Sequence, residues 1–304
     1  MMEWLGSLPG AAAQGLIWGI MAIGVYITYR ILDIADLTVD GTICTGAAVC
    51  TMMMLSGQSP WLSILCAVIA GAAAGVVTGL LHIVFGIPAI LAGILTQMAL
   101  WSVNLKILGK ANQAISARNT TVLLSQMDIP GALIVLMIAA AACIALLYLF
   151  FGTELGCGIR ATGANPNMSR AQGINTGFNT VLGLMLSNGL VALAGALLAQ
   201  YQGFADVSMG RGAIVIGLAA IIIGEALFGK IFHNFGLRLL GVSLGAVVYY
   251  IVIQVVILLG LDANLLKLLS ALVVAVFLAI PYWKGKYFAK PVARAAKKED
   301  TTNA

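Results

Sequence analysis

The chain alternates long apolar runs with short polar segments, and this alternation predicts its fold. A helix needs about 17–25 mostly apolar residues to cross a bilayer. Runs of that kind lie at residues 11–29, 61–81, 88–107, 131–151, 178–200, 211–229, 236–260 and 264–282. A shorter run, 41–55, becomes a further span when the semi-polar residues before it are included. Because the runs are solid rather than alternating, we expect helices and not barrel strands.

The pattern therefore predicts an all-α, polytopic membrane protein with about nine transmembrane helices, within a range of eight to ten. The composition agrees, because 61% of the 304 residues are hydrophobic and only 9% are charged. Soluble domains carry roughly a quarter charged residues, and so much apolar surface cannot be buried in one water-soluble core. We expect a single transmembrane domain at residues 1–283 and a basic tail at 284–304.

The distribution of lysine and arginine between alternate loops predicts the orientation, since cytoplasmic loops are enriched in both. One set of loops and the tail hold Arg30, Arg160, Arg170, Lys230, Arg238, Lys284, Lys286, Lys290, Arg294, Lys297 and Lys298. The other set holds Lys106, Lys110, Arg118, Arg211 and Lys267. This bias places the C-terminus in the cytoplasm and the N-terminus outside. The net charge of +5 then indicates a tail near anionic lipid, and no nucleic acid is expected as a partner.

Residues 152–177 form the one long polar stretch in the second half of the chain. Asn165 can cap a helix, Pro166 suits the first helical position, and Gly173 suits the left-handed conformation that ends one. The predicted helix has about seven residues, and helices this short are not stable alone in water. It therefore needs a surface on which to dock. On the orientation above, this stretch lies in the cytoplasm.

The sequence offers no constellation for catalysis or for metal binding. Its only histidines, His82 and His233, lie near predicted membrane edges, so a histidine-based metal cluster or relay is hard to assemble. The five cysteines show no CxxC spacing, which favours buried, inert thiols. Residues 224–231 resemble a phosphate-binding loop, but Ile231 stands where magnesium needs a hydroxyl group. We expect no catalytic residue, no metal and no cofactor.

Polar groups at membrane depth are the remaining candidates, since each is costly unless it is paired or faces water. Asp36 and Asp40 lie just before a membrane run. They belong either to an exposed loop or to a broken helix that faces a cavity, and the following Gly41 and the apolar neighbours favour the cavity. Glu225 is interpreted first as an interfacial residue whose side chain reaches the surface, and second as a substrate or proton ligand.

Amide side chains and glycines within the spans have two interpretations each. The amides are Gln97, Asn104, Asn188, Gln200 and Gln254. Hydrogen bonding between helices is the first interpretation of these amides, and lining of a substrate path is the second. Three glycines spaced by four within residues 71–79 allow close helix packing, which we place inside one subunit in preference to a dimer seam.

Several short motifs occur in a particular order. Residues 36–41 read Asp-Leu-Thr-Val-Asp-Gly, close to a D-L-S-V-G signature. Residues 71–100 follow as a helix pair, and residues 155–175 fit the pattern L-G … R-A-x-G-x-N-P … A-x-x-x-G-I-N. This order resembles the permease subunits of bacterial ABC importers for branched-chain amino acids and ribose-type sugars. The resemblance extends over residues 14–282 and is nearest to the tryptophan and tyrosine permeases.

The resemblance implies a dimer of identical permeases, two cytoplasmic ATPase subunits, and an extracellular lipoprotein or periplasmic binding protein. It also implies a multi-pass protein of the bacterial plasma membrane, which is a transporter subunit and not itself an enzyme. Asp40 departs from the sugar signature, and we expect no counterpart of the additional N-terminal span of some sugar permeases. We therefore expect inward transport of an amino acid, aromatic or branched-chain, ahead of a sugar or nucleoside.

By the same resemblance, a short helix in the polar stretch docks on the ATPase. The residues assigned to this coupling are Arg160, Gly163, Asn165, Pro166, Arg170 and Gly173. The residues assigned to a substrate path are Asp36, Asp40, Gln97, Asn188 and Gln200. An ion-coupled secondary transporter is the alternative class, and it predicts paired intramembrane charges and matching broken helices that the sequence does not display.

Overall fold

The computed structural model describes residues 2–115, 122–229 and 231–258, together with 268, 271, 272, 274–276 and 279, and for residues 2–7 the backbone only. The described residues form helices and one short ladder. The elements are α1 (Met2–Tyr26), the π-helical turn η1 (Ile27–Ile31), α2 (Val39–Leu55), α3 (Pro60–Ile83), α4 (Ala89–Leu108), β1 (Asn112–Ala114), α5 (Ile129–Phe150), α6 (Glu154–Ala164), α7 (Pro166–Ala171), α8 (Thr176–Gln202), β2 (Phe204–Asp206), α9 (Ala213–Phe228) and α10 (Phe235–Leu258).

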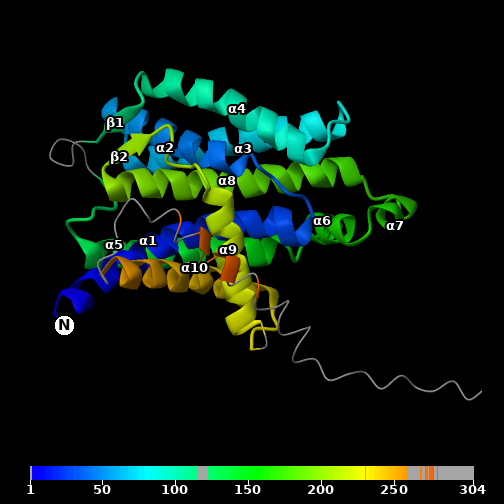
Figure 1. Ribbon diagram of the computed structural model, residues 1–304. Helices are drawn as coiled ribbons and strands as arrows, with labels where there is room; N and C mark the ends of the chain where they lie inside the picture. The colour runs from blue at the N-terminus through cyan, green and yellow to red at the C-terminus, as the bar shows by residue number, and fades with distance from the viewer. Residues whose placement is uncertain are drawn as a thin grey trace, which may run out of the picture.

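Helices α1 and α8 form the centre of the bundle (Figure 1). α8 packs against α1, α2 and α3, while α1 also packs against α5, α9 and α10. A helix surrounded by neighbours is apolar on all sides, and Ile17, Ile20 and Met21 on α1 are fully buried. The short helices α6 and α7 lie at one end of the bundle, and β1 and β2 lie at the other.

Most of the predicted spans are confirmed as long apolar helices. Within the described residues, six helices are long and apolar enough to cross a membrane: Leu8–Ile31, Pro60–Ile83, Ala89–Leu108, Ile129–Phe150, Thr176–Gln202 and Phe235–Leu258. The predicted spans 41–55 and 211–229 form shorter apolar helices, α2 and α9. Most of the predicted span 264–282 and all of the tail 284–304 lie outside the described residues, so the total of nine stays a prediction.

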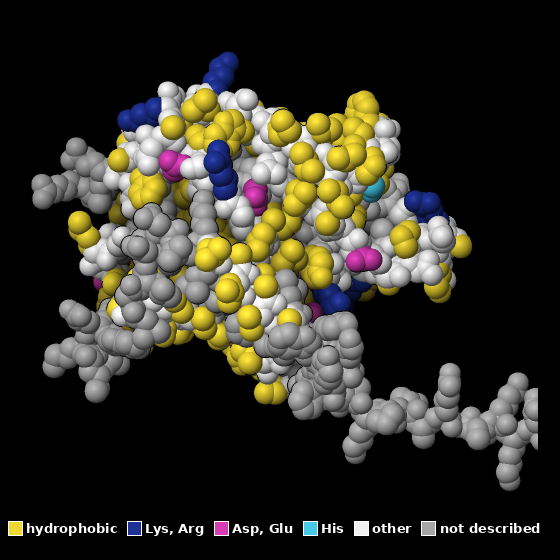
Figure 2. Space-filling view, in the orientation of Figure 1, with side chains coloured by type: hydrophobic (Ala, Val, Ile, Leu, Met, Phe, Trp, Pro, Cys, Tyr) yellow, Lys and Arg dark blue, Asp and Glu magenta, His cyan; other side chains and the backbone are white. Residues whose placement is uncertain are grey.

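The outer surface of the bundle is apolar, as a lipid environment requires. Exposed large side chains include Trp61 on α3 and Leu146 and Leu149 on α5, each about two-thirds exposed. Figure 2 shows one face covered largely by hydrophobic side chains, with few charged ones among them. A water-soluble protein rarely exposes apolar patches of this extent. The protein therefore places α3, α4 and α5 against lipid over much of their length.

The glycines of α3 pack inside the subunit, as predicted. A Cβ at Gly71 would collide with Ala192, and one at Gly75 with the carbonyl of Leu184. At Gly79 it would lie 3.0 Å from Cα of Val181. All of these neighbours belong to α8, so the glycines let two helix backbones approach closely within one chain.

The ladder between β1 and β2 departs from the expectation of helices alone. The strands pair antiparallel, with Asn112 opposite Asp206 and Ala114 opposite Phe204. Strands of three residues carry no readable alternation, and their partners lie far apart in the sequence. The pairing ties the segment after α4 to the segment between α8 and α9.

Candidate functional site

The polar stretch folds into two consecutive helices at one end of the bundle. Thr153 caps α6 by accepting a hydrogen bond from the N–H of Gly156 at 3.3 Å. Asn165 then leaves the helical conformation with φ −159° and caps α7, its Oδ1 accepting from the N–H of Met168 at 3.0 Å. Pro166 occupies the first turn of α7, and Gly173 adopts φ +80° after it. The capped short helix is confirmed, while the preceding helix α6 was not predicted.

The arginines of this stretch contact the chain itself. Arg170 donates from Nε to Oγ1 of Thr176 at 2.9 Å, which ties α7 to the first turn of α8. The guanidinium of Arg160 lies over the ring of Phe235, 4.2 Å from its centroid, at the start of α10. Their predicted contacts with an ATPase stay predictions. Met168 on α7 is 60% exposed, and the sequence did not mark it as a functional residue because its neighbours are polar.

Gly163 sets how closely α6 approaches the end of α1. A Cβ at this position would collide with the carbonyl oxygen of Ile31 and lie 2.8 Å from Cα of Leu32. On its other side α6 contacts α8, where Nδ2 of Asn179 donates to Oγ1 of Thr162 at 3.3 Å. α6 therefore packs directly against η1 and against α8.

A second candidate site is a small polar cavity between α2, α4 and the segment before α9. Its volume is about 60 Å³, and its lining includes Asp40, Gln97, Trp101, Asn104 and Arg211. The sequence placed Asp40 and Gln97 on a substrate path, and the structure brings these two together. Trp101 and Asn104 lie on the same face of α4 as Gln97, four and seven residues after it, whereas Arg211 comes from the segment before α9, which no sequence pattern joins to α4.

Asp40 also caps α9. Its Oδ2 accepts from the N–H of Gly212 and its Oδ1 from the N–H of Ile214, both at 2.9 Å. The N-terminal turns of two short helices, α2 and α9, thus meet at this carboxylate. Helix N-termini carry partial positive charge, which a carboxylate offsets. The helix preceding α2 is broken, because η1 ends at Ile31 and residues 32–38 form no helix.

One atom in the cavity wall lacks a partner. Asn104 donates from Nδ2 to the carbonyl of Gly41 at 3.2 Å, but its buried Oδ1 accepts no hydrogen bond from any described residue. Arg211 lies over Trp101, with its guanidinium carbon 4.7 Å from the ring centroid. A free buried acceptor is costly unless water or a ligand satisfies it. The cavity therefore combines a free acceptor, a carboxylate and a cation on an aromatic ring.

The remaining path candidates lie in the helix packing. Asp36 is 1% exposed and accepts from Nδ2 of Asn188 at 2.7 Å and from the N–H of Thr38 at 2.9 Å. Oδ1 of Asn188 accepts from Thr42 at 2.7 Å. Gln200 bonds the N–H of Leu123 and the thiol of Cys50 elsewhere in the bundle. These side chains join helices in this conformation, and any contact with solute stays a prediction.

Comparison with known proteins agrees with this architecture. The family model described as branched-chain amino acid transport system, permease component, matches residues 8–281. The chain belongs to this permease family. Membership makes it the permease component of a transport system and a multi-pass protein of the plasma membrane, in keeping with its long apolar helices.

Two relatives and one solved structure illustrate the likeness. A tyrosine transport system permease protein of Clostridioides difficile is 42% identical over 269 residues, 88% of each chain. An uncharacterized protein of Rickettsia prowazekii is 35% identical over 88% of this chain and 95% of its own. A chain of PsaBC from Streptococcus pneumoniae, solved in complex with Fab, has a TM-score of 0.55 at 16% identity, covering 95% of this permease and 99% of that chain. The last likeness concerns the fold alone.

Proposed function

We propose that this permease is the membrane subunit of an ATP-driven importer that carries an aromatic amino acid of the tyrosine class inward. The observation that carries the proposal is the 42% identity to a tyrosine transport permease over 88% of both chains. Two copies of the chain would form the transport path, with two ATPase subunits in the cytoplasm and a binding protein outside. The excess of basic residues at the α6–α7 end supports a cytoplasmic position for that end.

The polar cavity supports an amino acid as the solute. An α-ammonium group needs acceptors, and Oδ1 of Asn104 and the carboxylate of Asp40 are both at the cavity. A carboxylate needs a cation, and Arg211 is there, while Trp101 offers an aromatic surface. A cavity of about 60 Å³ admits water or one head group rather than a whole amino acid. In this proposal the helices must move apart for the solute to pass.

The helices α6 and α7 would carry the movement that opens the path. Met168 on α7 and Leu155 on α6 are 60% and 50% exposed, so a partner protein could bury apolar surface on either helix. Gly163 lets α6 pack against η1, so a displacement of α6 would move η1 and, through Asn179, α8. ATP binding would draw the two ATPases together and rock the packed helices about the path.

The proposal is tested by reconstituting the permease with its ATPase and binding protein in proteoliposomes. Uptake of labelled tyrosine is expected to depend on ATP, and leucine or ribose in excess is expected not to compete. Competition by ribose equal to that by unlabelled tyrosine would overturn the amino acid assignment. ATP-independent uptake driven by an ion gradient would overturn the ATPase-driven mechanism.

The cap of α7 gives a prediction for the coupling role. Asn165→Ala removes the acceptor for the N–H of Met168, which costs a helix about 1 kcal/mol. A helix of six residues has little other stability, so ATP hydrolysis stimulated by the loaded binding protein is expected to fall about fivefold, the factor equivalent to that energy. Asn165→Asp keeps the cap and is the matched control. Equal losses of stimulated ATP hydrolysis in Asn165→Ala and Asn165→Asp would show that coupling does not depend on the cap of α7.

A further inference from the structure

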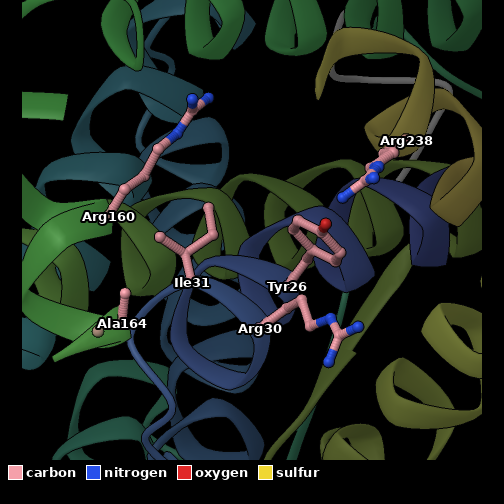
Figure 3. A pocket seen from close by; sticks show the side chains of 7 residues that line it. Tyr26, Arg30, Ile31, Arg160, Ala164 and Arg238 are labelled. Atoms are coloured by element: carbon pink, nitrogen blue, oxygen red, sulfur yellow. The ribbon is translucent and has the colours of Figure 1, made fainter. Parts of the chain in front are cut away.

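A second and larger pocket lies beside α6, and three arginines line it. The pocket has a volume of about 320 Å³ and is formed by α1, η1, α6 and α10. Arg30 belongs to η1, Arg160 to α6 and Arg238 to α10. Figure 3 shows Arg160 and Arg238 on opposite sides, with Ile31 and Tyr26 between them. Three cations from three separate elements thus share one cavity.

The positive charge of this pocket is not neutralised by the part of the chain that the structure describes. Arg30 forms an ion pair with Glu225, 3.1 Å between Nε and Oε1. Among the described residues no carboxylate lies within salt-bridge distance of Arg160 or Arg238. Arginines that merely extend toward the membrane surface need not converge. Arg160 and Arg238 are exposed at the open side of this cavity and have no carboxylate partner among the described residues, so an anion can bind between them.

Arg160 is held in place by contacts that leave its donors free. The guanidinium of Arg160 lies over the rings of Phe235 and Phe151, 4.2 and 5.4 Å from the centroids. Stacking of this kind uses the face of the group and not its N–H edge. Arg238 lies beside the hydroxyl of the buried Tyr26, a further polar group at the pocket.

We propose that this pocket binds a phosphate group. Phosphate offers several anionic oxygens to the planar donor fork of arginine, and all three cations here are arginine rather than lysine. Leu237, next to Arg238 on α10, is apolar and 40% exposed, so a phospholipid head group can reach the site with its chains in lipid. A soluble phosphate could also enter, since the pocket is open. A bound phosphate would link α10 to α6 across η1. The proposed transport of a solute does not require a phosphate at this site.

The test uses the full-length permease in nanodiscs and measures the midpoint of thermal unfolding as phosphate is added. One arm titrates phosphatidylglycerol into phosphatidylcholine, and the other adds inorganic phosphate to phosphatidylcholine alone. Arg238→Gln is expected to weaken the stabilising ligand on the order of tenfold, the loss of one hydrogen bond to a charged group. The matched control Lys110→Gln removes one exposed positive charge at the opposite end of the bundle and is expected to bind as wild type.

If Arg238→Gln loses only the stabilisation by phosphatidylglycerol, the ligand is a lipid head group. If it loses only the stabilisation by inorganic phosphate, the ligand is a soluble phosphate. Equal effects of Arg238→Gln and Lys110→Gln, or no stabilisation in either arm, would overturn the site. So would equal stabilisation by an anionic lipid that carries a carboxylate instead of phosphate. If Arg238→Gln does not fold, Arg238→Lys keeps the charge without the donor fork and is expected to show the weakened binding. Transport is not measured, so failure here leaves the proposed function untouched.

Discussion

Gly163→Val is expected to uncouple the permease from its ATPase while the core of the bundle still folds. A side chain at this position meets the backbone of Ile31 and Leu32, and backbone cannot rotate away as a side-chain tip can. Forcing extra carbons into a packed contact costs about 1–3 kcal/mol. Since 1.4 kcal/mol is about a factor of ten, ATP hydrolysis stimulated by the loaded binding protein should fall about tenfold or more.

The measurement compares stimulated ATP hydrolysis with the yield of monodisperse permease on size-exclusion chromatography. Gly189→Ala in α8 is the matched control, because a Cβ there meets nothing nearer than 3.7 Å. Gly163→Ala adds a single carbon and is expected to show an intermediate effect, which keeps the test informative if the valine variant does not fold. Full stimulation in Gly163→Val would mean that the contact between α6 and η1 does not transmit force.

Asn188→Asp is expected to be among the most destabilising single changes in the chain. Asn188 donates to the buried Asp36 at 2.7 Å, so the change sets two carboxyl groups against each other where no water reaches them. Losing a hydrogen bond to a buried charged group costs about 1.5–3 kcal/mol, and a second buried carboxyl group beside the first adds to that cost. Thr42 still finds an acceptor at the new carboxylate, while the donor to the carbonyl oxygen of Leu184, at 3.0 Å, is lost together with the donor to Asp36.

The exchange Asp36→Asn with Asn188→Asp should restore most of the lost stability. It leaves one amide and one carboxyl group facing each other, with an acceptor for Thr38 and for Thr42. Denaturant or thermal unfolding of the two single variants and the double variant gives their coupling energy, expected at about 2–3 kcal/mol. Strict additivity of the single effects would show that Asp36 and Asn188 do not act as a pair.

The long helices could be read from the sequence because lipid imposes a simple rule. A backbone in hydrocarbon must satisfy its own hydrogen bonds, so each long apolar run becomes a helix. The boundaries agree closely, as with the predicted run 61–81 and the observed α3, Pro60–Ile83. The capped helix α7 was equally readable, since Asn165, Pro166 and Gly173 act through local backbone geometry.

Structural features that depend on contacts between residues far apart in the sequence could not be predicted. The ladder of β1 with β2 joins segments on either side of four helices, and strands of three residues carry no pattern. The helix α6 combines glycines with polar residues, and it is held by packing against η1 and α8 rather than by propensity. The π-helical turn at Ile27–Ile31 likewise has no signature in the sequence.

By itself the sequence determined that the chain is a helical membrane protein, where most of its spans lie, and that a capped short helix interrupts them. These properties follow from the cost of burying backbone and charge in lipid, which each segment meets alone. Only the tertiary structure decided that Asp40 shares a cavity with Asn104 and Arg211 while Asp36 pairs with Asn188. Both aspartates stand four residues apart in one motif, and only the helices packed around them give each carboxylate its own partners.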